Sequence, residues 1–116
     1  MKSIIRGCYC MENSQAVEKM IALIERIESY SNGMDYTSFM QNDMAVDACV
    51  FNLSQLGELA GKIDNDFEDV NPQIPWRQIY GLRNRIVHDY EGVNLKLVWE
   101  IIESDLPELK NELELL

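Results

Sequence analysis

The chain has 116 residues, 47% hydrophobic and 26% charged, which is typical of one globular domain built around a single core. Its formal net charge of −10 argues against broad nonspecific binding to nucleic acid, because contacts to phosphates need Lys or Arg. No apolar run approaches the ~20 residues of a bilayer span, and the N-terminus lacks the apolar stretch of a signal peptide. We therefore expect one domain over residues 1–116, in the cytoplasm and away from membranes.

The cysteines and the single histidine do not form a metal-binding pattern. Cys8 and Cys10 are too close in sequence for an easy disulfide, and a reducing compartment leaves them as thiols. A closed zinc site would need more ligands than this spacing offers. Cys49 lies in an apolar helical pattern and is expected to be a small core residue. We expect no metal and no cofactor.

The first half of the chain predicts two long helices. After a short extended or irregular segment, Asn13 or Ser14 is expected to cap a helix that Asn32-Gly33 ends. Its apolar positions recur at helical spacing: Val17, Met20, Ile21, Ile24 and Ile27. A short turn with Tyr36 and Phe39 leads to a second helix, from Asn42 or Asp43 to Ile63. One face of that helix is apolar: Val46, Cys49, Val50, Leu53, Leu56 and Ala60.

The second half predicts two further helices. Residues 64–75 are expected to form a loop with a helical turn around Phe67, and Pro75 suits the first position of a third helix, from Trp76 to about His88. A fourth helix begins near Asn94 and runs toward the C-terminus, where Pro107 kinks or restarts it. The expected fold class is all-α, an antiparallel bundle of four to five helices.

The third predicted helix has two different faces. Its core stripe contains Ile79, Leu82 and Ile86, and its polar face contains Arg77, Gly81, Asn84 and His88. A glycine within a helix costs up to ~1 kcal/mol relative to alanine, so another backbone, such as that of a second subunit, is expected to approach it. The alternative is a local kink.

The segment from Arg83 to Tyr90 holds the candidate chemistry, because it contains the single histidine. Arg83 and His88 are five positions apart, about 140° around a regular helix, so they do not share one face. His88 therefore lies past the helix end, or the arginine reaches around the helix, or the site combines two chains. The purely structural alternative is that these side chains bond the last helix carbonyls, and that Asp89 pairs with Arg85.

Several segments of this chain resemble the HepT family of the HEPN superfamily. They are 74–77, 81–90 and 98–102, together with Asn52-Leu53 and residues 56–60. The most specific part is an arginine, four residues, a histidine, one residue and a tyrosine. In this chain the pattern is filled by Arg83, His88 and Tyr90, and Asn84 takes the usual polar position after the arginine.

The resemblance implies an all-α homodimer in which the two motif copies face each other across a cleft. It implies a metal-independent endoribonuclease toxin with Arg83, Asn84 and His88 as catalytic residues. It also implies an MNT-type nucleotidyltransferase antitoxin, which transfers AMP from ATP to Tyr90. The alternative is a catalytically weak module that binds a nucleotide or a partner protein.

Overall fold

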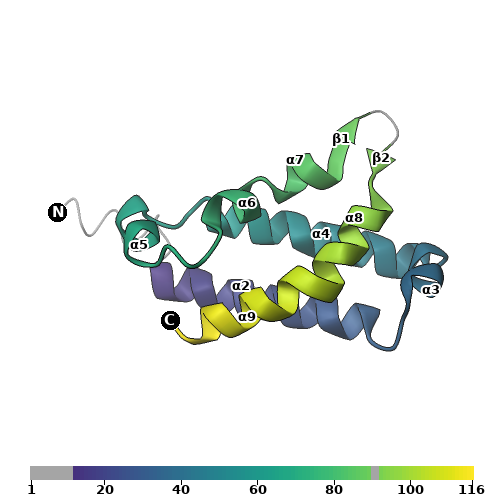
Figure 1. Cartoon of the computed structure of the whole chain (residues 1–116), viewed down its shortest axis with the longest axis horizontal. Coiled ribbons are helices and arrows are strands. Elements are labelled where there is room, and N and C mark those ends of the chain that lie inside the picture. The colour runs from purple at the N-terminus through teal and green to yellow at the C-terminus, as the bar shows by residue number, and fades with distance from the viewer. Residues whose placement is uncertain (1–11, 90–91) are drawn as a thin grey trace.

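The computed structural model describes residues 12–89 and 92–116, and these are predominantly helical (Figure 1). The N-terminal segment with Cys8 and Cys10 lies outside the described residues, as does Tyr90. The elements in chain order are α2 (Asn13–Ser31), α3 (Tyr36–Met40), α4 (Asp43–Ala60), α5 (Asn65–Val70), α6 (Trp76–Tyr80), α7 (Leu82–Ile86), β1 (Val87–Asp89), β2 (Gly92–Val93), α8 (Leu95–Glu100), the π-helical turn η1 (Ile101–Asp105) and α9 (Leu106–Glu114).

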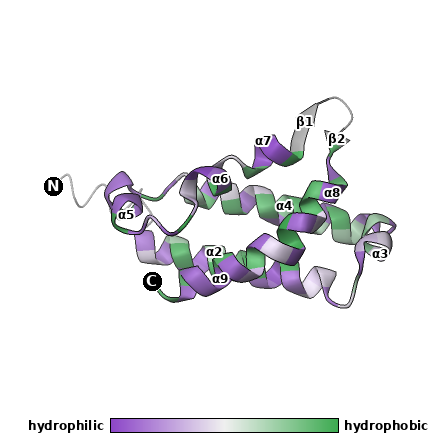
Figure 2. Ribbon diagram, viewed as in Figure 1, coloured by the Kyte–Doolittle hydropathy of each residue, from purple (hydrophilic) through white to green (hydrophobic). Residues whose placement is uncertain are grey.

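The long helices α2 and α4 pack antiparallel and form the centre of the bundle (Figure 1). The α8–η1–α9 segment runs back across α2, and α6 and α7 pack along α4. Figure 2 shows green and purple residues mixed along these helices, as expected where one helical face is buried and the other is exposed. The four predicted helices correspond to α2, α4, α6–α7 and α8–α9, so the all-α prediction is confirmed. The β1–β2 hairpin was not predicted.

The N-terminal cap of α2 differs from the prediction. The cap is Glu12, whose backbone N–H donates to Oε1 of Gln15 at 3.4 Å. Asn13 instead joins two parts of the chain, because its Oδ1 accepts from the backbone N–H of Asp64 at 3.2 Å. Asp64 is the N-cap residue of α5, so Asn13 holds the start of α2 against the start of α5. The Asn13 side chain, predicted to cap α2, therefore makes a long-range contact instead.

The start of α4 agrees with the prediction, since the helix begins at Asp43 and Asn42 is its N-cap. Oδ1 of Asn42 accepts from the backbone N–H of Ala45 at 3.0 Å, which satisfies one of the free donors at the helix start. The helix ends at Ala60, earlier than the predicted Ile63, although Ile63 is still buried. Of the predicted apolar face, Val46 and Val50 are half-buried and the remaining residues are buried.

The prolines and turns of the second half mostly behave as predicted. The helical turn around Phe67 is present as α5, and Pro75 is the N-cap of α6 rather than its first helical residue. Pro107 lies in the first turn of α9, directly after the π-helical turn. A proline has no N–H for the helical ladder, and a wider turn before it accommodates this loss. The helix thus restarts at the predicted place. None of the described helices is both long and apolar enough to cross a membrane.

Candidate active site

The predicted third helix is two short helices separated by Gly81. The Gly81 N–H donates to the Arg77 carbonyl at 3.0 Å and ends α6, and the Arg85 N–H donates to the Gly81 carbonyl at 3.1 Å as α7 begins. The predicted core stripe is confirmed, since Ile79, Leu82 and Ile86 are all buried. This side of α6–α7 faces the bundle. The predicted extent to His88 is wrong, because α7 ends at Ile86.

The close approach of two backbones occurs at Gly57 of α4. A Cβ there would lie 3.0 Å from the Ile79 carbonyl oxygen and 3.4 Å from that of Tyr80. Among the described residues, a Cβ at Gly81 would meet only carbonyl oxygens of α6, the nearest being that of Arg77 at 3.4 Å. Gly57 therefore lets α6 pack directly on α4, and Gly81 lies at the local break. Whether a second subunit approaches Gly81 stays a prediction.

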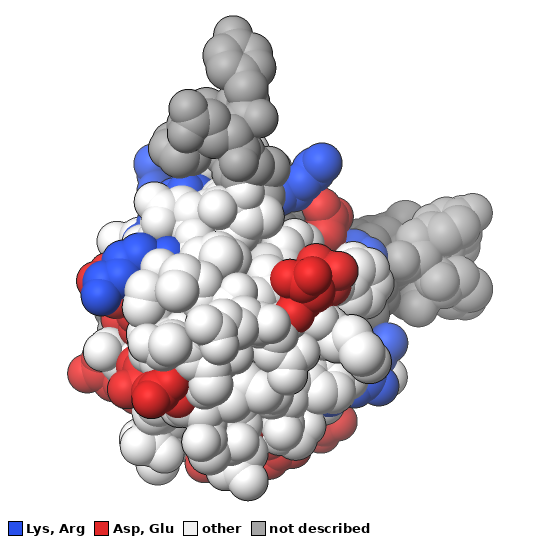
Figure 3. Space-filling model, turned by 90° about the vertical axis from the view of Figure 1, so that its right-hand side faces the viewer, with Lys and Arg blue, Asp and Glu red and all other residues white. Residues whose placement is uncertain are grey.

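The outward side of α7 is polar and cationic. Arg83, Asn84 and Arg85 are consecutive and exposed, and Arg77 is exposed on α6. Among ion pairs between the described side chains, Lys110 is the cation and these arginines do not take part. Figure 3 shows blue side chains at the top of the molecule, the end at which α7 and the hairpin lie in Figure 1. This surface can receive an anion such as a phosphate.

His88 lies in the hairpin, past the end of α7, as one of the sequence-based alternatives proposed. Val87 pairs with Val93 and Asp89 pairs with Gly92, so β1 advances two residues while β2 advances one. His88 is therefore the extra residue of a β-bulge. Bulges occur frequently beside active sites, where they redirect a side chain.

The structure does not describe the remaining contacts of this segment. The side chains of Val87, His88 and Asp89 are outside the described part, and with them the predicted pairing of Asp89 with Arg85. Tyr90 lies outside it altogether. Within the described residues, Arg83 and Asn84 lie on α7 and His88 lies on the strand that follows it. Tyr90 comes two residues after His88 in the sequence.

A hairpin signal was present in the sequence and was missed. Val87 and Val93 are β-branched residues that favour strands, and Glu91-Gly92 between them suits a turn. The segment was assigned to the preceding helix because Ile79, Leu82 and Ile86 continue the helical spacing up to its edge.

A groove of about 270 Å³ lies between α6–α7 and the η1–α9 segment, next to the cationic surface, and Arg85 borders both. Its apolar floor includes Leu82, Ile101 and Leu106. Its charged lining residues are Arg85, Asp105, Glu108 and Glu112, so acidic residues outnumber the single arginine. Such a rim disfavours a phosphate, and the exposed surface around Arg83 and Asn84 is the better candidate site for one.

No group of three or more His, Cys, Asp and Glu side chains in the described part of the chain is arranged to hold a metal ion. Cys49 is completely buried in α4, as predicted, and burial raises the pKa of its thiol to about 11. A thiol with such a pKa is protonated near neutral pH, so Cys49 is a packing residue rather than a nucleophile.

Comparison with known proteins gives the family. The family described as ribonuclease HepT-like matches residues 20–116. "Putative RNase MJ1380" of Methanocaldococcus jannaschii is 36% identical over 87 residues, which cover 75% of this chain and 80% of that protein. "Probable ribonuclease HepT" of Thermococcus cleftensis is 31% identical over 100 residues, 86% of this chain and 91% of the relative. No solved structure matches.

This chain belongs to the HepT-like ribonuclease family of HEPN proteins. The family match begins at Met20 and includes α4 and the whole segment from α6 to α9. It therefore contains every candidate site residue named above.

Proposed function

We propose that this protein is a metal-independent endoribonuclease toxin, neutralised by a nucleotidyltransferase antitoxin. The observation that carries the proposal is the arrangement of the motif within a ribonuclease family. Arg83 and Asn84 are exposed on α7, and His88 follows in a bulged strand directly after that helix. A cation, an amide and an imidazole are thus supplied by adjoining elements.

These groups suit RNA cleavage by the ribose 2′-OH. That reaction needs a base for the 2′-OH proton, an acid for the leaving 5′-oxygen, and a cation for the charge that develops on the phosphorus oxygens. The forked donors of Arg83 fit the non-bridging phosphate oxygens, Asn84 can orient the phosphate, and His88 can move a proton. The products would carry 2′,3′-cyclic phosphate and 5′-hydroxyl ends.

A homodimer completes this chemistry, because each chain has one histidine and the reaction has two proton transfers. Exposed apolar side chains on and beside α4 support such an association. Met44 is 83% exposed, Phe51 is 61% exposed, and Tyr80, whose ring packs near Gly61, is 66% exposed. Large apolar side chains gathered at a surface are typical of protein interfaces. Met44 and Phe51 are seven residues apart and share one side of α4, and we propose that the dimer contact lies there.

The regulatory part of the proposal concerns Tyr90. Transfer of AMP to its hydroxyl would add bulk and negative charge within the same segment as His88, and this charge would repel an RNA phosphate. Purified protein incubated with the antitoxin, ATP and Mg²⁺ should gain about 329 Da on the Tyr90 peptide and lose RNase activity. Tyr90→Phe should stay active and unmodified. If Tyr90→Phe is still fully inhibited by active antitoxin, inhibition works by binding alone.

The catalytic proposal is tested by RNA cleavage in the presence of EDTA. Arg83→Ala and His88→Ala should each reduce the rate roughly 10²–10⁴-fold, while Arg77→Ala, also an exposed arginine, changes it little. Analysis of the product ends distinguishes the mechanisms. Products with 5′-phosphates, or activity lost on chelation, would exclude the 2′-OH mechanism. Absence of cleavage by the unaltered protein, with antitoxin binding retained, would favour the binding-module alternative.

A further inference from the structure

A second groove lies between α2 and α4, lined by residues that the proposed RNase site does not use. Its volume is about 420 Å³. Its apolar lining residues are Ala22, Leu23 and Leu59. All its charged lining residues are cations, namely Lys19, Arg26 and Lys62. Among the lining residues that the structure describes there are three cations and no carboxylate, which is unexpected in a chain with 20 acidic and 10 basic residues.

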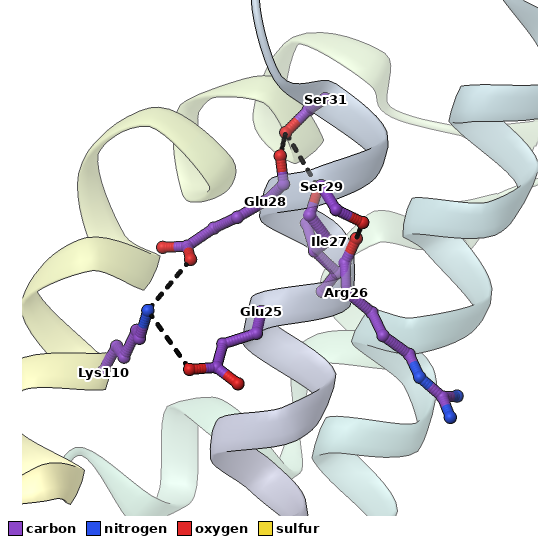
Figure 4. A network of polar contacts seen from close by, with 7 residues as sticks. All are labelled: Glu25, Arg26, Ile27, Glu28, Ser29, Ser31 and Lys110. Carbon is purple, nitrogen blue, oxygen red and sulfur yellow. Dashed lines mark hydrogen bonds and ion pairs between the residues drawn. The ribbon is translucent and has the colours of Figure 1, made fainter.

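The charges on α2 are separated between two sides of the helix. On one side, Lys110 of α9 contacts Glu28 at 3.1 Å and Glu25 at 3.5 Å. Figure 4 shows both carboxylates pointing toward Lys110, whereas Arg26 points away from α9. Lys19 and Arg26 are seven residues apart, so they share one side of the helix. The acidic side of α2 faces α9, and the basic side lines the groove.

The packing of α9 on the acidic side of α2 shows what kind of helix suits a surface of α2. α9 buries Leu106, Leu109 and Leu113 in the core and places Lys110 against the acidic side of α2. The groove resembles this contact with the charges reversed, since it combines aliphatic side chains with cations instead of carboxylates. A helix that fills it would bury leucine-type side chains on Leu23 and Leu59 and offer carboxylates to Lys19, Arg26 and Lys62.

The lining favours a peptide over RNA. Sites for single-stranded nucleic acid combine cations with aromatic rings on which bases stack. None of the described lining residues is aromatic, and the apolar ones are aliphatic. Aliphatic side chains pack well against the apolar face of an amphipathic helix, and the cations then supply charge complementarity at the edge.

We propose that the groove between α2 and α4 is a docking site for an acidic amphipathic helix of a partner protein. The helix lies along the groove, with its apolar face on Leu23 and Leu59 and its carboxylates beside the three cations. The site is separate from Arg83, Asn84 and His88, and its occupation does not depend on RNA cleavage.

The test uses labelled helical peptides of about 20 residues, long enough to hold helical structure. One has a leucine stripe flanked by glutamates, the second has lysines in place of the glutamates, and the third is a scrambled acidic sequence without the stripe. Fluorescence anisotropy with the full chain should show one acidic amphipathic peptide bound per chain. Its binding should weaken with salt and exceed that of the other two peptides at least about tenfold.

Substitutions of opposite charge at one position locate the site. Ala22 is exposed in the groove, so Ala22→Glu and Ala22→Lys leave the core intact. Ala22→Glu should weaken binding of the acidic peptide about fivefold or more, and Ala22→Lys should maintain or strengthen it. Lys19→Glu should also weaken it, whereas Lys96→Glu on α8 makes the same charge change and serves as the matched control. Circular dichroism checks folding.

Four results would overturn the proposal. The first is equal binding of the acidic and basic peptides, and the second is acidic-peptide binding that both Ala22 variants leave unchanged. The third is that Lys19→Glu abolishes binding of an oligoribonucleotide while peptide binding persists. The fourth is a change of oligomeric state in Lys19→Glu, which would assign the groove to a second copy. Because the test measures peptide binding, its outcome does not depend on whether the protein cleaves RNA.

Discussion

The backbone N–H of Asn94 donates a 2.8 Å hydrogen bond to the carbonyl of Ile86. Ile86 is the last residue of α7 and is fully buried, and Asn94 is the N-cap of α8. The segment that holds His88 and Tyr90 therefore begins and ends at one point on the core. The two ends of this segment thus join α7 and α8.

Asn94→Ala should lower stability through the loss of a helix cap. Oδ1 of Asn94 accepts from the Leu97 N–H at 3.1 Å, and alanine has no acceptor there. We expect the free energy of unfolding, measured by denaturant titration, to fall by about 0.5–2 kcal/mol. Asn94→Asp keeps the acceptor and should lose much less. Equal losses in the two variants would show that the cap is not the cause.

Ile86→Ala should affect both stability and cleavage. The side chain is 0% exposed, and truncation of a buried isoleucine typically costs about 2–5 kcal/mol. Alanine keeps the backbone bond to Asn94 but loses the buried side chain that fixes the end of α7, where the hairpin starts, so RNase activity should fall even where the protein remains folded. Ile86→Val, expected to cost about 0.5–1.5 kcal/mol, is the matched control. Full RNase activity in folded Ile86→Ala would show that catalysis does not depend on the packing of Ile86 at the base of the hairpin.

Gly57→Val should destabilise the contact between α4 and α6. Any Cβ at this position would lie 3.0 Å from the Ile79 carbonyl oxygen, and that backbone atom can move only if α6 moves. We expect a loss of about 1–3 kcal/mol in thermal or chemical unfolding. Gly81→Ala meets its nearest atom at 3.4 Å and should be nearly neutral. A larger loss at Gly81 than at Gly57 would contradict this account.

Cys49 should resist alkylation in the native protein. With its thiol pKa raised to about 11 by burial, roughly a thousandth of it is thiolate at about pH 8. Peptide mapping after iodoacetamide treatment should find Cys49 modified only after unfolding. Since the folded pKa lies above the ordinary value of 9.0, its contribution to stability is present below about pH 9 and falls as pH rises toward about 11. Rapid alkylation of Cys49 in the native protein would show that its thiol is not buried.

Dimer formation should depend on the exposed side of α4. Phe51→Glu places a charge among the exposed apolar side chains and should shift the proposed dimer to monomer in light scattering. RNA cleavage should fall with it. Lys96→Glu, which reverses a charge on α8 instead, should leave the dimer unchanged. A monomer that cleaves RNA at the full rate would remove the argument for a site shared by two chains.

The amino-acid sequence by itself determined the helices of this protein wherever the signal is local. The spacing of Met20, Ile24 and Ile27 defines the buried face of α2, and Ile79, Leu82 and Ile86 define that of α6–α7. Both follow from helical geometry, which places residues three or four apart on one side. The motif of Arg83, His88 and Tyr90 was likewise readable, and with it the family.

The tertiary structure alone decided where these helices stop and what their outer faces form. The helix ends before His88 because Ile86 bonds to Asn94 across the hairpin, and the close helix contact lies at Gly57 because α6 crosses α4 there. Lys19 and Lys62 are distant in sequence, and only the antiparallel packing of α2 and α4 brings them to one groove. Periodicity reports on a residue's neighbours along its own helix, whereas these features depend on contacts between segments far apart in the chain.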